Sequence, residues 1–97
     1  MNYQHFSNLL GKRNSKKLAH NTYAVKQANG DIEIRLHQTA IVTYMPNGKA
    51  ILSTGGWQTA TTKDRLNKFG PVQIYQKDFV WYLSTGEVFK NGMIIIQ

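Results

Sequence analysis

Glycine, threonine and basic residues are concentrated between residues 52 and 70, in an order typical of an anion-binding turn. A Gly-Gly pair precedes a threonine-rich segment that is expected to begin a helix, and backbone amides at such a beginning bind anions. Basic side chains raise the positive potential there, and a tryptophan ring offers a nucleobase a stacking surface. The sequence therefore predicts a phosphate-binding site formed by Gly55, Gly56, Trp57, Thr59, Thr61, Thr62, Lys63 and Arg65.

Arg35 and His37 extend this site, because they share one face of a predicted strand and suit an acidic ligand. Simpler explanations stay open. The Gly-Gly segment lacks the Gly-Lys-Ser or Gly-Lys-Thr ending of a Walker phosphate loop, so it also fits an ordinary turn before a capped helix. Trp57 is either a stacking surface or a plug at the open end of a barrel. Arg35 and His37 fit a solvated strand face equally well.

The sequence offers no catalytic or metal-binding constellation. Its five acidic residues form no pair suited to general acid and base catalysis, and no Gly-x-Ser-x-Gly nucleophile segment is present. The three histidines lack a spacing typical of zinc, and the absence of cysteine excludes thiolate chemistry, disulfides and cysteine-ligated metals. We therefore expect a protein that is not an enzyme and that needs no metal or cofactor.

The charge balance favours an anionic partner. Twelve lysines and arginines against five acidic residues give a formal charge of +7, which promotes association with nucleic acid, nucleotides or acidic proteins. Surplus lysine serves solubility as well. A helix that contains Phe6 and ends at Gly11 is predicted at the N-terminus. It is followed by a basic arm, which either binds anions or is a frayed end, and which consists of Lys12, Arg13, Lys16 and Lys17.

The length of 97 residues and the hydrophobic share of 41% fit a single small core. We expect residues 1–20 to form the N-terminal helix and basic arm, and residues 21–97 to form one β-rich domain. The longest apolar run, residues 93–96, is far shorter than the roughly 20 residues of a membrane-spanning helix. The N-terminus lacks the charged start and apolar stretch of a secretory signal. These features predict a cytoplasmic protein without a membrane partner.

From residue 21 onward, apolar residues recur with a period of two and turn signals follow at short intervals. Asn29-Gly30, Asn47-Gly48 and Asn91-Gly92 predict type I′ hairpin turns. The predicted fold class is mainly β, an antiparallel barrel or a strongly twisted sheet of short hairpins, with one short internal helix besides the N-terminal helix and arm. The predicted strands are residues 22–27, 31–37, 40–45, 49–53, 72–76, 79–84, 87–90 and 93–97.

The internal helix is expected to begin at Thr61 as N-cap, with Asp64 in the capping role, and to end at Gly70. Its basic side chains are expected to point outward. Residues 79, 81 and 83 predict an apolar stripe on one strand face. Residues 93–96 lack alternation, so this strand is either central in the sheet or pairs with a second copy in a homodimer.

Short segments spaced along the chain form a recognisable pattern. They are Asn21-Thr-Tyr, Ile34-Arg-Leu-His37-x-Thr39, Val42-Thr-Tyr44, Asn47-Gly48 and Gly55-Gly56-Trp57-x-Thr-x-Thr-Thr-Lys63-x-Arg-Leu-Asn67. This pattern, over about residues 16–82, resembles a family of short bacteriophage proteins that carry no assigned activity. The resemblance implies a phage origin and action inside a bacterial cell, and it supplies no catalytic residues.

Two functions are therefore expected from the sequence. The first is a small, non-enzymatic basic protein that binds a phosphate-rich ligand, either nucleic acid or a nucleotide, through the threonine-rich loop and the basic arm; this binding weakens steeply with salt. The second is a direct protein inhibitor of a bacterial host or defence factor, which would use exposed aromatic side chains as anchors and lysines for steering.

Overall fold

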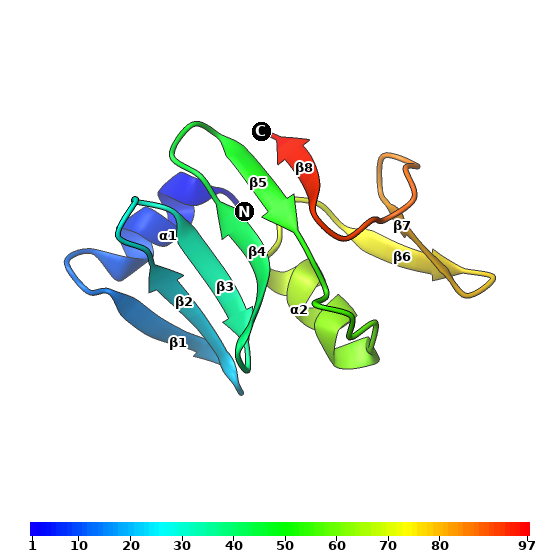
Figure 1. Cartoon of the computed structure of the whole chain (residues 1–97), viewed down its shortest axis with the longest axis horizontal. Coiled ribbons are helices and arrows are strands. Elements are labelled where there is room, and N and C mark those ends of the chain that lie inside the picture. The colour runs from blue at the N-terminus through cyan, green and yellow to red at the C-terminus, as the bar shows by residue number, and fades with distance from the viewer.

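The computed structural model describes residues 1–97 as a six-stranded antiparallel sheet, two helices and a separate two-stranded hairpin (Figure 1). The strand order is β1-β2-β3-β4-β5-β8, and β6 pairs with β7. The mainly β fold class is confirmed, as an open sheet rather than a closed barrel. The elements are α1 (Tyr3–Leu10), β1 (Ser15–Ala19), β2 (Thr22–Lys26), β3 (Ile32–Leu36), β4 (Thr39–Tyr44), β5 (Lys49–Leu52), α2 (Ala60–Phe69), β6 (Ile74–Lys77), β7 (Val80–Leu83) and β8 (Met93–Ile96).

Both helices cover the same face of the six-stranded sheet. Burial alternates along β3 from Ile32 to Leu36, which puts every second side chain on this face. Phe6 of α1 lies with its ring centroid 5.3 Å from that of Tyr44 in β4, and Leu66 of α2 is buried in the same core. Because the helices leave the other face of the sheet uncovered, alternate strand residues remain partly exposed there.

The N-terminal segment is part of the domain, which corrects the expected basic arm. The predicted helix is present, with Gly11 as its C-cap, and it buries Phe6 and Leu10. Ser15–Ala19, however, forms β1 and pairs along β2. This strand was missed because its apolar residues are too few to show a period of two, whereas the edge of β2 offers it hydrogen-bonding partners.

The Asn-Gly pairs form turns of a different type from the one predicted. At the β4–β5 connection, the Gly48 amide donates to the Met45 carbonyl at 3.0 Å, and only Gly48 has a positive φ, of 88°. This is a type I turn followed by a left-handed glycine. The Asn29-Gly30 turn repeats this arrangement. Asn91-Gly92 instead occupies the centre of a turn that the Met93 amide closes on the Lys90 carbonyl at 3.1 Å, with a positive φ only at Gly92. The type I′ turn is found instead at Asp78-Phe79, where both φ angles are positive.

The β6–β7 hairpin projects from the end of the molecule (Figure 1). Trp81 and Leu83 are buried as predicted, but Phe79 is 94% exposed because it occupies the turn rather than the strand. The predicted strand at residues 87–90 is wrong. Only one isolated bridge, between Tyr82 and Val88, forms there.

The β8 strand lies at an edge of the sheet, next to β5 and near the C-terminus, so the prediction that it is central is wrong. Ile94 and Ile96 are 56% and 79% exposed. Neither helix has the length and apolar composition that crossing a membrane requires.

Candidate nucleotide-binding pocket

The loop between β5 and α2 turns sharply at its two glycines. Gly55 has a φ of 61° and Gly56 a φ of 90°, a conformation that side chains other than glycine rarely adopt. A Cβ atom on Gly55 would lie 2.6 Å from the Thr39 Cγ2 atom of β4. The predicted need for glycine here thus has two causes, the left-handed backbone and the close approach to β4.

Helix α2 begins two residues earlier than predicted, with Thr59 rather than Thr61 as its N-cap. The Thr59 hydroxyl accepts a hydrogen bond from the Thr62 amide at 3.2 Å, and the Thr59 carbonyl accepts one from the Lys63 amide at 3.1 Å. Thr59 wins this role because its extended backbone lets its hydroxyl reach the third helical amide. The amides of Ala60 and Thr61 have no acceptor within the chain, as expected at a helix start.

Trp57 lies on the surface immediately before this helix. Its backbone is fixed by hydrogen bonds to Thr54 and Thr59, while its side chain is 67% exposed and its indole N–H has no partner. The ring therefore does not plug the fold, and of the two interpretations open from the sequence only a surface role remains. In the open sheet, the buried tryptophan is Trp81.

A cavity of about 550 Å³ lies between this loop and the β3–β4 turn. In that turn His37 has a φ of 56°, and its amide donates to the Asn21 carbonyl at 2.7 Å. The side chains of His37, Gln38, Thr39 and Thr61 form no hydrogen bond within the chain, so their polar atoms are free to meet a ligand. The cavity is lined by Leu36, His37, Gln38, Thr39, Ile41, Thr54, Trp57, Thr59, Thr61 and Thr62.

The cavity contains part of the predicted site. His37, Trp57, Thr59, Thr61 and Thr62 line it, and the two glycines shape the loop beside it. The lining residues that the sequence did not indicate belong to β3, β4 and their connection, together with Thr54. No local pattern marks them, because they reach the loop only through the pairing of β4 with β5.

Thr54 holds the loop onto the rest of the fold. It is 1% exposed, and its amide and its hydroxyl both donate hydrogen bonds to the Asn91 side-chain oxygen, at 2.7 and 3.0 Å. Asn91 belongs to the connection that leads into β8. Asn91, which the sequence indicated only as a turn residue, thus supports the cavity wall through Thr54.

Arg65 does not face the cavity, which corrects the predicted site. Its Nε donates to the Thr22 hydroxyl of β2 at 2.8 Å, and it is also bonded to the His20 carbonyl and to Asp64. Its side chain is only 14% exposed. It occupies this position because the turn of α2 that packs against β2 points it at a buried hydroxyl and a carbonyl oxygen.

The other expected cations also lie outside the cavity lining. Lys63 donates to the Gln76 side chain of β6 at 3.2 Å, and Arg35 pairs with Glu33 on the uncovered face of the sheet at 2.8 Å. The hydrogen bond from Lys68, with a smaller contribution from Arg65, lowers the pKa of Asp64. Asp64 is therefore engaged with two cations rather than with the helix cap. No lysine or arginine lines the cavity, whose walls combine polar, aromatic and aliphatic side chains.

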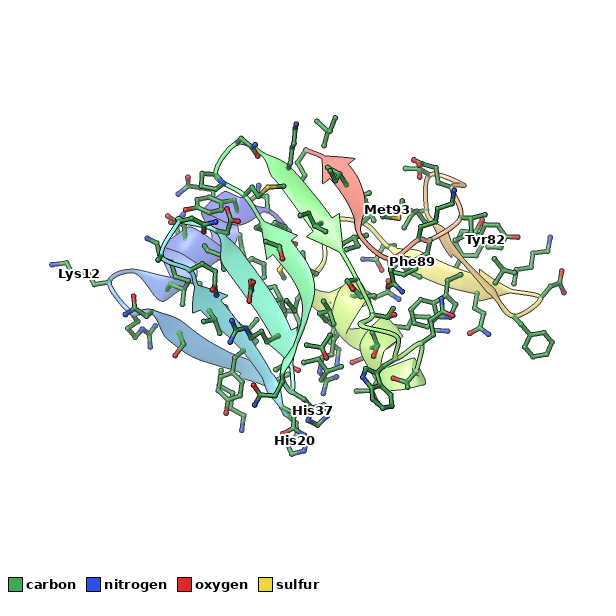
Figure 2. All side chains as sticks on the ribbon, viewed as in Figure 1. Lys12, His20, His37, Tyr82, Phe89 and Met93 are labelled. Atoms are coloured by element: carbon green, nitrogen blue, oxygen red, sulfur yellow. The ribbon has the colours of Figure 1, made fainter.

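Of the expected arm, Lys12 lies at the opposite end of the strands from His20 and His37 (Figure 2). Lys12, Arg13 and Lys26 line a second, open hollow of about 530 Å³. Arg13 caps α1 by donating to the Leu9 and Leu10 carbonyls, whereas Lys12 and Lys26 have no carboxylate partner. Lys16 and Lys17 lie on β1 and point to opposite faces of the sheet. No group of three or more acidic or histidine side chains is placed to hold a metal ion.

The family model described as Kyanoviridae Gp96 protein matches residues 1–96. This match confirms the resemblance to a bacteriophage protein family and extends it beyond residues 16–82, to include α1, β1 and β8. No curated protein and no solved structure matches the chain.

Proposed function

Because the chain belongs to the Kyanoviridae Gp96 family of bacteriophage proteins, we propose that it acts in the cytoplasm of the infected bacterium as a nucleotide-binding or nucleic-acid-binding protein without enzymatic activity. One observation supports this most directly. The exposed ring of Trp57 stands at the rim of a cavity that is lined by four polar side chains without a partner in the chain, those of His37, Gln38, Thr39 and Thr61.

The size and lining of the cavity suit a nucleotide. Its volume of about 550 Å³ lies in the range of small-molecule sites, and such sites combine apolar walls with a few free polar groups. A nucleobase stacks on Trp57, while Gln38 and His37 are in reach of its edge or of the sugar. The phosphate accepts hydrogen bonds from the free amides of Ala60 and Thr61.

The overall charge favours an anionic ligand, although no lysine or arginine lines the cavity. Only three of the twelve cationic side chains form ion pairs, namely Arg35, Arg65 and Lys68. The remaining positive charge attracts a polyanion and makes its binding dependent on salt. The exposed Trp57 ring offers a surface on which a base stacks, and the unpaired lysines attract phosphates. The protein therefore suits a nucleic-acid single strand as well as a mononucleotide.

Isothermal titration calorimetry with purine and pyrimidine nucleotides and with short single-stranded oligonucleotides tests this function. We expect binding that Trp57→Ala weakens about tenfold or more, because stacking on an aromatic ring contributes about 1–3 kcal/mol per base. Tyr23→Ala is the matched control, since Tyr23 is also an exposed aromatic residue, on β2. Absence of binding at low salt, or equal affinities of the two variants, would contradict the proposal.

The β6–β7 hairpin supports a second candidate, inhibition of a bacterial host or defence protein. The hairpin exposes Tyr75, Phe79 and Val80, and Val88, which is bridged to Tyr82 of β7, is exposed as well. Exposed aromatic anchors of this kind are typical of protein interfaces. Affinity capture from nuclease-treated bacterial lysate distinguishes the two candidates. One host protein retained by the wild type and lost with Phe79→Ala would favour inhibition, whereas only nuclease-sensitive material would favour the phosphate-rich ligand.

A further inference from the structure

The two edges of the six-stranded sheet differ in how they are protected. The β1 edge carries Lys16 and Lys17, and charged side chains discourage the addition of another strand. The β8 edge consists of Met93–Ile96, with no charged residue, proline or bulge. Figure 1 shows no further element alongside the outer side of β8, which pairs only with β5.

The hydrogen-bond pattern identifies which groups of β8 point outward. The Gln97 amide donates to the Gly48 carbonyl at 3.0 Å, so this residue pair belongs to the bonded positions of the β5–β8 ladder. Bonded and non-bonded pairs alternate in antiparallel sheets. Ile95, opposite Ala50, is therefore a bonded position, whereas Ile94 and Ile96 direct their N–H and C=O groups away from β5.

We propose that two copies of this chain associate through β8, antiparallel, with Ile95 on the two-fold axis. In this register Ile94 of each copy lies opposite Ile96 of the other, and each such pair exchanges both of its N–H···O=C hydrogen bonds. The two sheets become one continuous sheet. This dimer is independent of the proposed nucleotide binding, because β8 contributes no residue to the cavity.

A second copy satisfies the β8 edge better than an unrelated strand does. An antiparallel strand paired with itself is self-complementary, so the same residues supply donors and acceptors on both sides and the assembly closes at two copies. Ile94 and Ile96, which are 56% and 79% exposed, become cross-strand neighbours on the uncovered face. Because β8 has no charged side chain, no like charges lie on the two paired strands, and Lys49, which is opposite Ile96, belongs to the next strand, β5.

Analytical ultracentrifugation of the full chain, without nucleotide, over a range of concentrations tests this dimer. We expect the wild type to move from monomer to dimer mass as its concentration rises, and to stop there. Ile94→Pro should remain monomeric, because proline removes an outward N–H that β5 does not use and is tolerated on an edge strand. Ile96→Lys should also remain monomeric, through charge at the same edge.

Ile51→Ala is the control. Ile51 lies opposite Ile94 on the same face of the sheet but belongs to β5, whose backbone takes no part in the contact, so this variant should still dimerise. Far-ultraviolet circular dichroism of each variant confirms that its sheet is formed. A wild type that stays monomeric up to about 1 mM, the weak end of the affinity scale, would overturn the proposal. Folded Ile94→Pro and Ile96→Lys variants that dimerise like the wild type would overturn it as well.

Discussion

Tyr44 shows how one buried side chain joins the sheet to a helix. Its ring is fully buried beside Phe6, and its hydroxyl donates to the Phe69 carbonyl at the end of α2, at 2.7 Å. Burial raises the pKa of Tyr44 well above the ordinary value of 10.0. The folded state therefore keeps this proton under alkaline conditions in which the unfolded chain loses it.

The sign of the resulting pH dependence follows from linkage. Because the folded-state pKa is raised, the contribution of Tyr44 to stability is complete below about pH 10 and is lost as the pH rises above that value. We predict that Tyr44→Phe lowers the free energy of unfolding at pH 7 by about 1–2 kcal/mol, through the lost hydrogen bond. The variant should also lose less stability than the wild type above about pH 10. Urea unfolding of the wild type and of Tyr44→Phe at pH 7 and above about pH 10 measures both effects. Equal losses of stability in the two proteins on going to the higher pH would refute the prediction.

Among single residues, the sequence indicated the type of chemistry better than its position. It indicated the loop with Trp57 and the threonines that line the cavity, because glycines and a helix start mark such a loop locally. It failed for Arg65, since whether a helical cation points to solvent or to β2 depends on how the helix docks. It gave no sign of Thr39 or Gln38, which the chain brings to the loop only by pairing β4 with β5.

At the scale of elements, α2 is attached to the sheet through Arg65 as well as through its apolar side. The guanidinium joins the buried Thr22 hydroxyl and the His20 carbonyl, at 2.8 and 3.3 Å. We predict that Arg65→Ala lowers the free energy of unfolding by about 2–3 kcal/mol, because it removes charge-assisted hydrogen bonds to partly buried groups. Lys63→Ala, the control on the exposed side of the same helix, should change it by less than about 0.5 kcal/mol.

Chemical denaturation of both variants measures this difference. Equal stabilities would mean that Arg65 contributes nothing to the docking of α2.

The β6–β7 hairpin keeps a residue that its turn disfavours. Phe79 has a φ of 65° and is 94% exposed, although a type I′ turn prefers glycine at this position. We predict that Phe79→Gly raises the free energy of unfolding by about 0.5–1 kcal/mol, because it relieves left-handed strain that outweighs the entropy added to the unfolded chain. Phe79→Ala keeps the strain and should show no gain. Thermal unfolding that ranks the alanine variant above the glycine variant would contradict this explanation.

Most elements could be predicted from the sequence, with specific physical exceptions. Alternating apolar and polar residues indicated β3, and turn residues bounded the neighbouring strands. Two strand assignments failed where the period of two is weak: β1 has few apolar residues, and residues 87–90 form only one bridge. The turn at Asp78-Phe79 was missed because Asp78 suits a type I′ turn but is followed by Phe79 where glycine is usual.

In the whole molecule, the cavity, the lysine-lined hollow and the β6–β7 hairpin lie apart from one another. The cavity with Trp57 lies at one end of the strands, the hollow with the unpaired Lys12 and Lys26 lies at the other, and the β6–β7 hairpin projects beyond the sheet (Figures 1 and 2). The composition predicted an anionic partner but gave no information on this distribution, because net charge is insensitive to which cations are paired internally.

The proposed ligand occupies the cavity at the start of α2, and nuclear magnetic resonance can locate it there. Nitrogen–proton correlation spectra recorded during addition of the tightest-binding nucleotide report each amide and both indole groups. We predict that the Trp57 indole and the Ala60 and Thr61 amides shift together, while the indole of the buried Trp81 stays unchanged. Shifts confined to the β6–β7 hairpin or to the Lys12 hollow, with the Trp57 indole unmoved, would contradict the claim.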